Sequence, residues 1–581
     1  MKQTAKILFL CIFGILYTFS LSSAQLKGPL VVSDRWPECT DLFTWSRDIF
    51  RLDGVSNSSE RDRAISFFNW LRLYNRLCEG AGGMAHAFEG AWAEEKSVRD
   101  LHKHLFVYGW GFCDTHSIVA EGFWQEYMKD SLAADRVICM HENGGYHTMY
   151  RLRTDGHFGA FDARYGYYLL EKDTPDARIL DWEGVGDDRN IRANMKYANR
   201  CRPFFEFPEK ELERALWVKP KKIFESEAAW RAAGTEPEVV FRNRQYRMGT
   251  KFHDMRFSLP RGTTIERWWD NRMKKWYIPK KNKDMFLPEG RFYRVGASMV
   301  GGDGEKNDPN WKYMKPYLTR VPEGLGYPKY LEGDLSLGQA WGKISYNPVL
   351  SRGDLEELKL TGSGLETYPV SPYIRPSADT GEGEWMLEFY SPYILVDGFI
   401  SGELTGTKND KLEIAFRSQE PKSRNISQAD QWLPWKTLSS KPGRFLVTLD
   451  RADAAGGESS FHGTYRWQLR IRLASGTTRP DSAEEAAPAG VSDLDVVTYF
   501  ETGIMSIPQI FDGENTIRFK MDDPAQIKGD LLAKYVWETA EGEQSHEKLL
   551  SPRLFFKDNE AVYRIEAPGL ERCKALIISY P

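Results

Sequence analysis

The chain has 581 residues, more than one hydrophobic core usually serves, so we expect about three to four folding units. Its hydrophobic fraction of 41% and charged fraction of 28% are typical of a soluble globular protein. The net charge of −4 argues against a nucleic-acid partner or a membrane-surface partner for the chain as a whole. No cofactor-binding motif is present, and we predict no cofactor.

The first 24 residues have the pattern of an export signal. Lys2 and Lys6 precede an apolar run over residues 7–21, and small residues at 22–24 form a cleavage site before Gln25. The apolar run is short for a membrane span, although an uncleaved anchor is the alternative interpretation. We therefore predict a periplasmic or secreted protein that begins near Gln25 and has no membrane span after cleavage.

Helical patterns come before strand patterns in the next part of the chain. Residues 25–58 look irregular, and a capping arrangement that begins at Ser59 predicts a helix that continues to residue 77. Strand-like runs follow only after residue 145. Helices followed by strands within one unit predict an α+β fold for a domain of residues 25–200.

A further helix is predicted from Cys113 to Tyr127, because this run contains no proline and has apolar residues at helical spacing. Cys113 would then lie in the first turn of the helix. Unpaired N–H groups and the helix dipole at that position favour a thiolate. The sequence therefore makes Cys113 a candidate nucleophile.

Two strand-like runs, residues 146–153 and 157–164, are separated by Asp155-Gly156. This dipeptide strongly indicates a two-residue hairpin with positive φ at both positions. The turn pairs Thr154 with His157 and so fixes the register of the whole hairpin.

In this register Met149 lies opposite Asp162, and His147 shares the face of Met149. His147 is then a diagonal neighbour of Asp162, at about 7–8 Å between backbones. A helix-terminal thiol packed against that face would complete a nucleophile, a base and an orienting acid in Cys113, His147 and Asp162.

These residues together resemble the transglutaminase-like superfamily. The resemblance rests on G-x-C-x-x-x-S at residues 111–117, on His147 within a strand, and on Asp155-Gly156 followed by Asp162. It implies a papain-like core in which Cys113 attacks an amide-type carbonyl, His147 exchanges the proton and Asp162 orients the histidine. The chain departs from the common bacterial pattern in having a threonine after His147, where His-Ala-Trp is usual.

Other interpretations of these residues stay open. Cys113, Cys139, His141 and His147 could supply sulfur and nitrogen ligands to zinc, but the paired C-x-x-C spacing of such sites is absent, and we predict no metal. A lone cysteine is also commonly a small buried hydrophobe. Trp110 could donate its indole N–H toward an oxyanion.

Residues 201–345 are expected to be mixed and β-rich, and they contain a basic aromatic stretch at 261–283. This stretch carries eight basic and two acidic residues with aromatic side chains interleaved. Such a surface could bind an acidic glycan or polymer by stacking and charge. The alternative is a twisted hairpin whose tryptophans belong to the core. The candidate binding residues are Arg267, Trp268, Trp269, Lys274, Lys275 and Trp276.

The rest of the chain is predicted to be β-structure. Strand-like runs at sandwich spacing predict a β-sandwich for residues 346–505, and a small β domain follows over 506–581. The predicted sandwich strands are 386–390, 393–400, 412–416, 444–449, 465–473 and 494–500.

Taken together, these patterns predict an exported cysteine hydrolase that acts on a peptide, a glycopeptide or a related amide. The first alternative is a polysaccharide lyase or hydrolase for an acidic glycan, with His147 and either Tyr146 or Tyr150 as proton-transfer groups. The second alternative is a glycan-binding surface protein without catalysis.

Overall fold

The computed structural model describes residues 28–74, 76–77, 100–108, 110–111, 113–140, 146–162, 167–172, 174–182, 195–197, 223–233, 240–243, 252–270, 272–273, 339–420, 431–449, 458–476, 488–555 and 559–581. Strands make up 47% of this structure and only four α-helices occur within these ranges, so the fold is mostly β-sheet and includes a half-barrel sheet. The predicted α+β fold with a transglutaminase-like, papain-like core is therefore wrong. Strands from both ends and from the middle of the chain join common sheets, whereas the four α-helices of the described ranges lie in its first half. No helix in the described ranges is long and apolar enough to cross a membrane.

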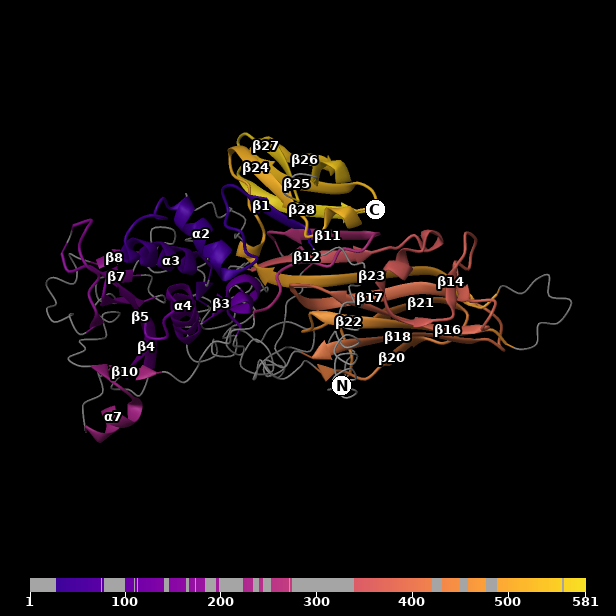
Figure 1. The fold of residues 1–581 in the computed structure, drawn as a ribbon, viewed down its shortest axis with the longest axis horizontal. Helices are drawn as coiled ribbons and strands as arrows, with labels where there is room; N and C mark the ends of the chain where they lie inside the picture. Colours follow the sequence, from indigo (N-terminus) through magenta and orange to yellow (C-terminus); the bar gives the residue numbers. More distant parts are fainter. Residues whose placement is uncertain are drawn as a thin grey trace, which may run out of the picture.

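Three α-helices pack together in the N-terminal part of the chain (Figure 1). They are α2 (Leu42–Leu52), α3 (Glu60–Tyr74) and α4 (Cys113–Met128). The prediction of α4 is confirmed, and so is that of α3 except at its end, because the helix stops at Tyr74 and residues 76–77 form a strand. The helix α2 corrects the expectation that residues 25–58 are irregular. The remaining helical segments are α7 (Glu227–Ala232), a π-helical segment (Lys103–Tyr108), and short 3-10 turns at Leu350–Arg352, Asp354–Leu358, Ile504–Ser506, Pro524–Gln526 and Pro552–Phe555.

Aromatic side chains hold the three helices together. Phe67 of α3 stacks on Phe123 of α4 at 4.2 Å between ring centroids. Trp45 of α2 contacts both rings edge-on, at 6.1 and 5.3 Å. All three side chains are fully buried or nearly so, and burial of each contributes roughly 1.5–3 kcal/mol to folding.

A seven-stranded sheet stands beside these helices, and α4 packs against its strands β4 and β5. Its order is β8-β7-β6-β5-β4-β10-β9, and every neighbouring pair is antiparallel except β9 with β10. The strands are β4 (Ala134–Met140), β5 (Tyr146–Thr154), β6 (His157–Asp162), β7 (Tyr167–Leu169), β8 (Met195–Tyr197), β9 (Ile223–Phe224) and β10 (Val240–Asn243). A short parallel pair, β2 (Arg76–Leu77) with β3 (Trp110–Gly111), precedes α4.

Two larger sheets form the body of the molecule (Figure 1). Tyr346 of the ten-stranded sheet contacts Phe389 of the six-stranded sheet at 5.2 Å, so the two sheets share a core. The ten-stranded sheet contains β11 (Thr263–Trp268), β12 (Gln339–Tyr346), β14 (Leu365–Thr367), β15 (Ile374–Pro376), β17 (Ile394–Thr405), β21 (Gly443–Thr448), β23 (Gly490–Gly503), β25 (Leu531–Thr539), β26 (Gly542–Leu550) and β28 (Arg572–Tyr580). The six-stranded sheet contains β13 (Lys359–Ser363), β16 (Glu382–Tyr390), β18 (Lys411–Glu420), β19 (Gln431–Trp432), β20 (Lys436–Ser439) and β22 (Arg466–Ala474). All six predicted sandwich strands are confirmed.

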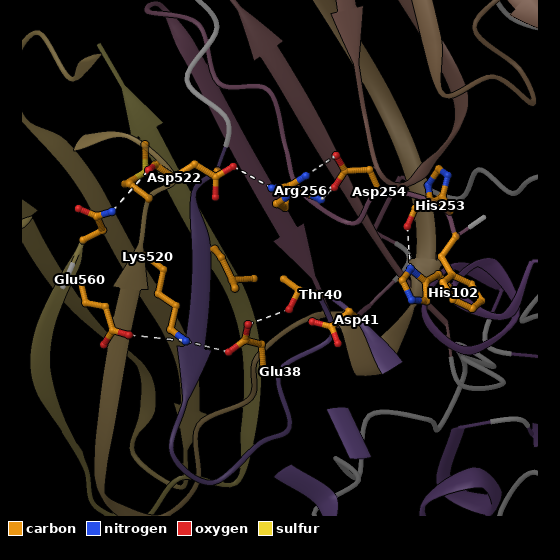
Figure 2. A pocket seen from close by; sticks show the side chains of 15 residues that line it. Glu38, Thr40, Asp41, His102, His253, Asp254, Arg256, Lys520, Asp522 and Glu560 are labelled. Atoms are coloured by element: carbon orange, nitrogen blue, oxygen red, sulfur yellow. Dashed lines mark hydrogen bonds and ion pairs between the residues drawn. The ribbon is translucent and has the colours of Figure 1, made fainter. Parts of the chain in front are cut away.

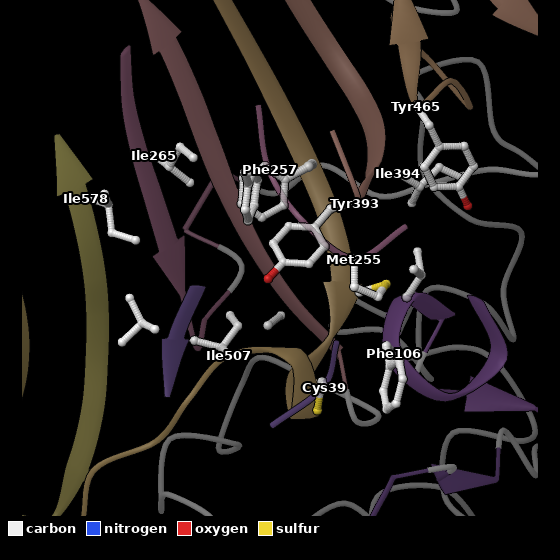
Figure 3. Close-up of a cluster of buried hydrophobic side chains, with 14 of the residues drawn as sticks. Cys39, Phe106, Met255, Phe257, Ile265, Tyr393, Ile394, Tyr465, Ile507 and Ile578 are labelled. Carbon is white, nitrogen blue, oxygen red and sulfur yellow. The ribbon is translucent and has the colours of Figure 1, made fainter. Parts of the chain in front are cut away.

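Segments that are far apart in the sequence share sheets and core. The strand β1 (Leu30–Ser33) pairs with β24 (Gly513–Lys520), which also pairs with β27 (Glu560–Ala567). Strands predicted for different domains therefore lie in one sheet. Figure 3 shows the same mixing in the core, where Cys39, Phe106 and Phe257 lie near Tyr393 and Ile507.

Candidate functional site

The hairpin predicted to carry the histidine and the aspartate has the expected register. Thr154 pairs with His157, and Asp155 and Gly156 have φ values of 51° and 84°. The ladder ends with Tyr150 opposite Phe161, so Asp162 takes the place opposite Met149, the next residue of β5. The prediction of the hairpin register is confirmed.

The helix α4 runs parallel to β5 and is tied to it at two points. The Ser117 hydroxyl donates a hydrogen bond to the Thr148 carbonyl at 3.3 Å, and the Trp124 indole donates to the Arg153 carbonyl at 3.0 Å. The helix begins at Cys113, four residues before Ser117. Four residues of helix span about 6 Å, as do about two residues of a strand. The main chain of residue 113 therefore lies roughly level with residues 146 and 147 of β5.

The two faces of this sheet have different neighbours. Arg136 of β4 forms a 2.7 Å ion pair with Glu121 of α4, so its side chain points toward the helix. Because side chains alternate along a strand, every second residue counted from Arg136 in β4, and from its register partner Tyr150 in β5, lies on this helix side. Arg151 belongs to the other series and binds Asp135 with two hydrogen bonds of 2.8 Å each. In the register, positions 147 and 162 continue the series of Arg151, on the face away from α4.

Charge on the second face is tightly paired. Arg151 also donates to the Asp181 carboxylate at 2.7 Å and lies over the Phe158 ring. Burial by itself would lower the pKa of Arg151, but the hydrogen bonds and charges of Asp135 and Asp181 raise it above its ordinary value. Arg151 is therefore a fixed cation on β5, the strand that also carries His147.

The three predicted catalytic residues occupy defined main-chain positions. Cys113 is the first residue of α4, His147 pairs with Cys139 in the β4–β5 ladder, and Asp162 is the last residue of β6. The Asp162 side chain is fully buried. The side chains of Cys113, Cys139, His147, Tyr146 and the oxyanion candidate Trp110, and the whole of His141, lie outside what the structure describes.

The structure bears on two alternatives from the sequence, a proton-transfer role for Tyr150 and a zinc site. Tyr150, offered as a proton-transfer group, is fully buried and stacked on Phe161 at 5.7 Å, which makes it a core residue. Among the described side chains, no group of three or more His, Cys, Asp or Glu is arranged to hold a metal ion.

The basic aromatic stretch is not an exposed surface where it is described. Arg267, Trp268 and Trp269 are 3%, 5% and 1% exposed. Arg267 and Trp268 belong to β11, a central strand of the ten-stranded sheet between β12 and β28, and Trp268 packs against Trp341 and Ala575 of those neighbouring strands. Trp269 follows β11 directly and lies in the main core. These three residues belong to the core. The other candidates of this stretch, Lys274, Lys275 and Trp276, lie outside the described residues.

A pocket of about 670 Å³ lies where the N-terminal segment meets residues 252–256 and the C-terminal strands (Figure 2). Its charged side chains form two clusters. Lys520 bridges Glu38 and Glu560, at 2.9 and 3.6 Å. No local sequence pattern indicates this pocket, because the N-terminal and C-terminal segments that line it are more than 470 positions apart.

The second cluster centres on Arg256. Its guanidinium bonds Asp254 through two nitrogens, at 2.9 and 3.1 Å, and Asp522 at 2.9 Å. Burial by itself would raise the pKa of Asp254, but the hydrogen bonds and charge of Arg256 hold it below its ordinary value. The pocket wall is therefore built from paired charges at neutral pH.

Asp41 completes the acidic wall in a different way. It is the N-cap of α2, and its carboxylate accepts the main-chain N–H groups of Phe43 and Thr44 at 2.9 Å each. Burial by itself would raise the pKa of Asp41, whereas these hydrogen bonds and the nearby His102 lower it below its ordinary value. Asp41 is therefore an anion stabilised by a helix N-terminus.

Comparisons with known proteins place the chain in no family. No protein-family model matches it, and no curated protein matches it. Among solved structures, the chain is similar to the crystal structure of a putative beta-galactosidase from Bacteroides fragilis, with 11% identity and a TM-score of 0.11. The match covers 35% of this chain and 28% of that one.

Proposed function

We propose that the protein is an exported cysteine hydrolase that cleaves an amide-type bond, with Cys113 as nucleophile, His147 as base and Asp162 as the group that orients the histidine. The observation that carries the proposal is the hydrogen bond from Ser117 to the Thr148 carbonyl. It ties the first turns of α4 to the residue that follows His147.

The chemistry follows from the residue types. A cysteine at a helix N-terminus has its thiolate stabilised by unpaired N–H groups and by the dipole. The thiolate attacks the carbonyl carbon, and the imidazole gives its proton to the leaving amine. Water then hydrolyses the thioester and returns the thiol. The main-chain N–H of Cys113 is suited to donate to the oxyanion, because the first N–H groups of a helix have no partner within it.

The two faces of the sheet set a requirement for this proposal. Position 147 belongs to the series that faces away from α4. The proposal therefore requires the thiol and the imidazole to meet around the end of the sheet and not through the helix–sheet interface.

The test is amine release from defined polymers by the purified full chain. A peptide library and a glycopeptide are incubated with the wild type and with Cys113→Ala, His147→Ala and Asp162→Asn, and new amines are measured by fluorescence. We expect Cys113→Ala to abolish release and Asp162→Asn to slow it by roughly 10²–10⁴-fold, as loss of an orienting carboxylate does in other triads.

An acidic glycan is assayed in parallel for new reducing ends and unsaturated products. Full activity of Cys113→Ala on any substrate would overturn the thiol mechanism. Glycan cleavage that depends on His147 and not on Cys113 would favour the polysaccharide-degrading alternative.

A further inference from the structure

We propose that the pocket between the N-terminal segment, residues 252–256 and the C-terminal strands is a binding site for a neutral saccharide (Figure 2). This site does not depend on the cysteine chemistry proposed above. Its volume of about 670 Å³ lies within the range of about 300–1,000 Å³ that small-ligand sites occupy.

His102 supplies the first argument. Its Nδ1 lies 2.7 Å from the His253 carbonyl oxygen, and because a carbonyl only accepts, Nδ1 carries the proton. The residue is 4% exposed, and Nε2 is buried with no hydrogen-bond partner in the described part of the chain. A buried polar atom without a partner is costly, and a ligand hydroxyl, which can both donate and accept, would satisfy this nitrogen.

The His102 ring lines the pocket and points into it from the wall beside Asp41 (Figure 2). Its flank is covered by Phe252, whose ring stacks on the imidazole at 4.7 Å between centroids. Phe252 is half-buried and lines the same pocket. An apolar ring beside a polar wall suits a pyranose, which has an apolar face of C–H groups and an edge of hydroxyl groups.

Charge argues against an anionic ligand. Five carboxylates line the pocket and only two side chains there, Lys520 and Arg256, are permanent cations. A uronate, a sulfate or a phosphate would meet net negative charge. The five carboxylates are Glu38, Asp41, Asp254, Asp522 and Glu560.

The pairing of these charges also argues against a cationic ligand. Four of the carboxylates already contact Lys520 or Arg256, and the fifth, Asp41, accepts from the N-terminus of α2. Each of the five carboxylates therefore already has a compensating partner, and no cationic ligand is needed. A hydroxyl group can donate to a remaining carboxylate lone pair and accept from a remaining N–H of the same ion pair, and a saccharide offers several such groups at once.

Calorimetric titration of the full chain tests the proposal. The probes are methyl glycosides of glucose, galactose, mannose, xylose and N-acetylglucosamine, with the corresponding β-linked disaccharides. We expect at least one to bind with a millimolar or lower Kd. His102→Asn retains a nitrogen near the position of Nδ1 but lacks Nε2, and it should weaken that binding roughly tenfold, as loss of one buried hydrogen bond does.

The matched control is His157→Asn, at an exposed position of the β5–β6 hairpin, which should leave the Kd unchanged. If His102→Asn unfolds, Glu560→Gln at the pocket rim replaces it and should weaken binding by a similar factor. Binding of no glycoside would overturn the proposal. So would a Kd that neither pocket variant changes, or binding of ethanolamine or glucuronate in place of the neutral probes.

Discussion

Asp155, in the turn between β5 and β6, and Glu60, the first residue of α3, exchange hydrogen bonds. The main-chain N–H of Asp155 donates to the Glu60 carboxylate at 2.7 Å, and the Asp155 carboxylate accepts from the main-chain N–H of Glu60 at 3.4 Å and of Arg61 at 3.3 Å. The hairpin turn therefore caps the N-terminus of α3 from outside the helix. This contact holds the strands that carry His147 and Asp162 against the helical layer.

The first prediction concerns this cap. Asp155→Ala should lower the local stability of α3 by about 1 kcal/mol, because two helix N–H groups lose an acceptor and alanine is disfavoured at a φ of 51°. Asp155→Asn should have a smaller effect, since asparagine tolerates positive φ and keeps an acceptor oxygen. Hydrogen exchange of the α3 amides, followed by mass spectrometry, measures both. Equal exchange in the alanine variant and the wild type would contradict the role of the turn.

The second prediction concerns the ion pair that ties α4 to the sheet. Arg136 is fully buried and the Glu121 side chain is 9% exposed. Glu121→Ala leaves a buried guanidinium without this partner, and we expect a loss of about 3–5 kcal/mol in the free energy of unfolding.

The double variant Glu121→Leu with Arg136→Met removes both charges and should recover most of that stability. Denaturant unfolding followed by tryptophan fluorescence measures the series. A double variant less stable than Glu121→Ala would show that the charges themselves hold α4 in place.

Local chemistry explains which parts of the fold could be predicted. Asp155-Gly156 determines its own turn, and because side chains alternate along a strand, one turn gave the register of the whole hairpin. The helix α3 begins at Glu60, directly after Ser59, whose hydroxyl accepts the Asp62 N–H at 3.2 Å as the capping pattern predicted. The missed helix α2 also has a local signal, since Asp41 is its N-cap.

The errors come from partners that are distant in the sequence. Trp268 and Trp269 looked like a binding surface because an isolated strand with alternating charges resembles one. Their burial depends on β28, which pairs with β11 from more than 300 residues away. The fold class failed for the same reason, since the pairing of β1 with β24 draws the N-terminal segment into a β-structure that no local pattern indicates.

The third prediction concerns thiol reactivity. Iodoacetamide should label Cys113 faster than Cys573 at pH 7, because a helix N-terminus favours the thiolate, whereas burial raises the pKa of Cys573 to about 12. His147→Ala should slow the labelling of Cys113 if the imidazole stabilises the thiolate as an ion pair.

Peptide mapping after timed quenching gives both rates. Cys39 is a second internal reference, because its buried thiol donates to the Met505 carbonyl at 3.3 Å. Labelling of Cys113 as slow as that of the buried thiols would contradict the nucleophile assignment.

The fourth prediction concerns acid and rests on His253. This side chain is partly buried, and its Nε2 donates to the Pro392 carbonyl at 2.7 Å. Burial, together with the charge of Lys103, lowers the pKa of His253 from 6.5 to about 3. The unfolded chain protonates this histidine near pH 6.5 and the folded chain does not until about pH 3. Between these values the unfolded state binds more protons, so stability falls as the pH falls, by up to about 1.4 kcal/mol per pH unit.

His253→Gln removes this titration and can still donate to the Pro392 carbonyl, so it isolates the effect. At pH 7.5 the variant should be less stable than the wild type, because it loses the packing of the ring on Tyr465 at 4.6 Å. As the pH falls from 6.5 to 4.5, the difference in unfolding free energy between the two should shrink by up to about 2.7 kcal/mol. Asp100 accepts the main-chain N–H of His253 in the wild type and keeps this donor in the variant, so its own titration largely cancels in the difference.

Urea unfolding at four pH values measures the difference, and His157→Gln, at an exposed position of the hairpin, is the matched control. A difference that stays constant from pH 7.5 to 4.5 would show that His253 binds its proton at the same pH in the folded and the unfolded chain, which contradicts the lowered pKa.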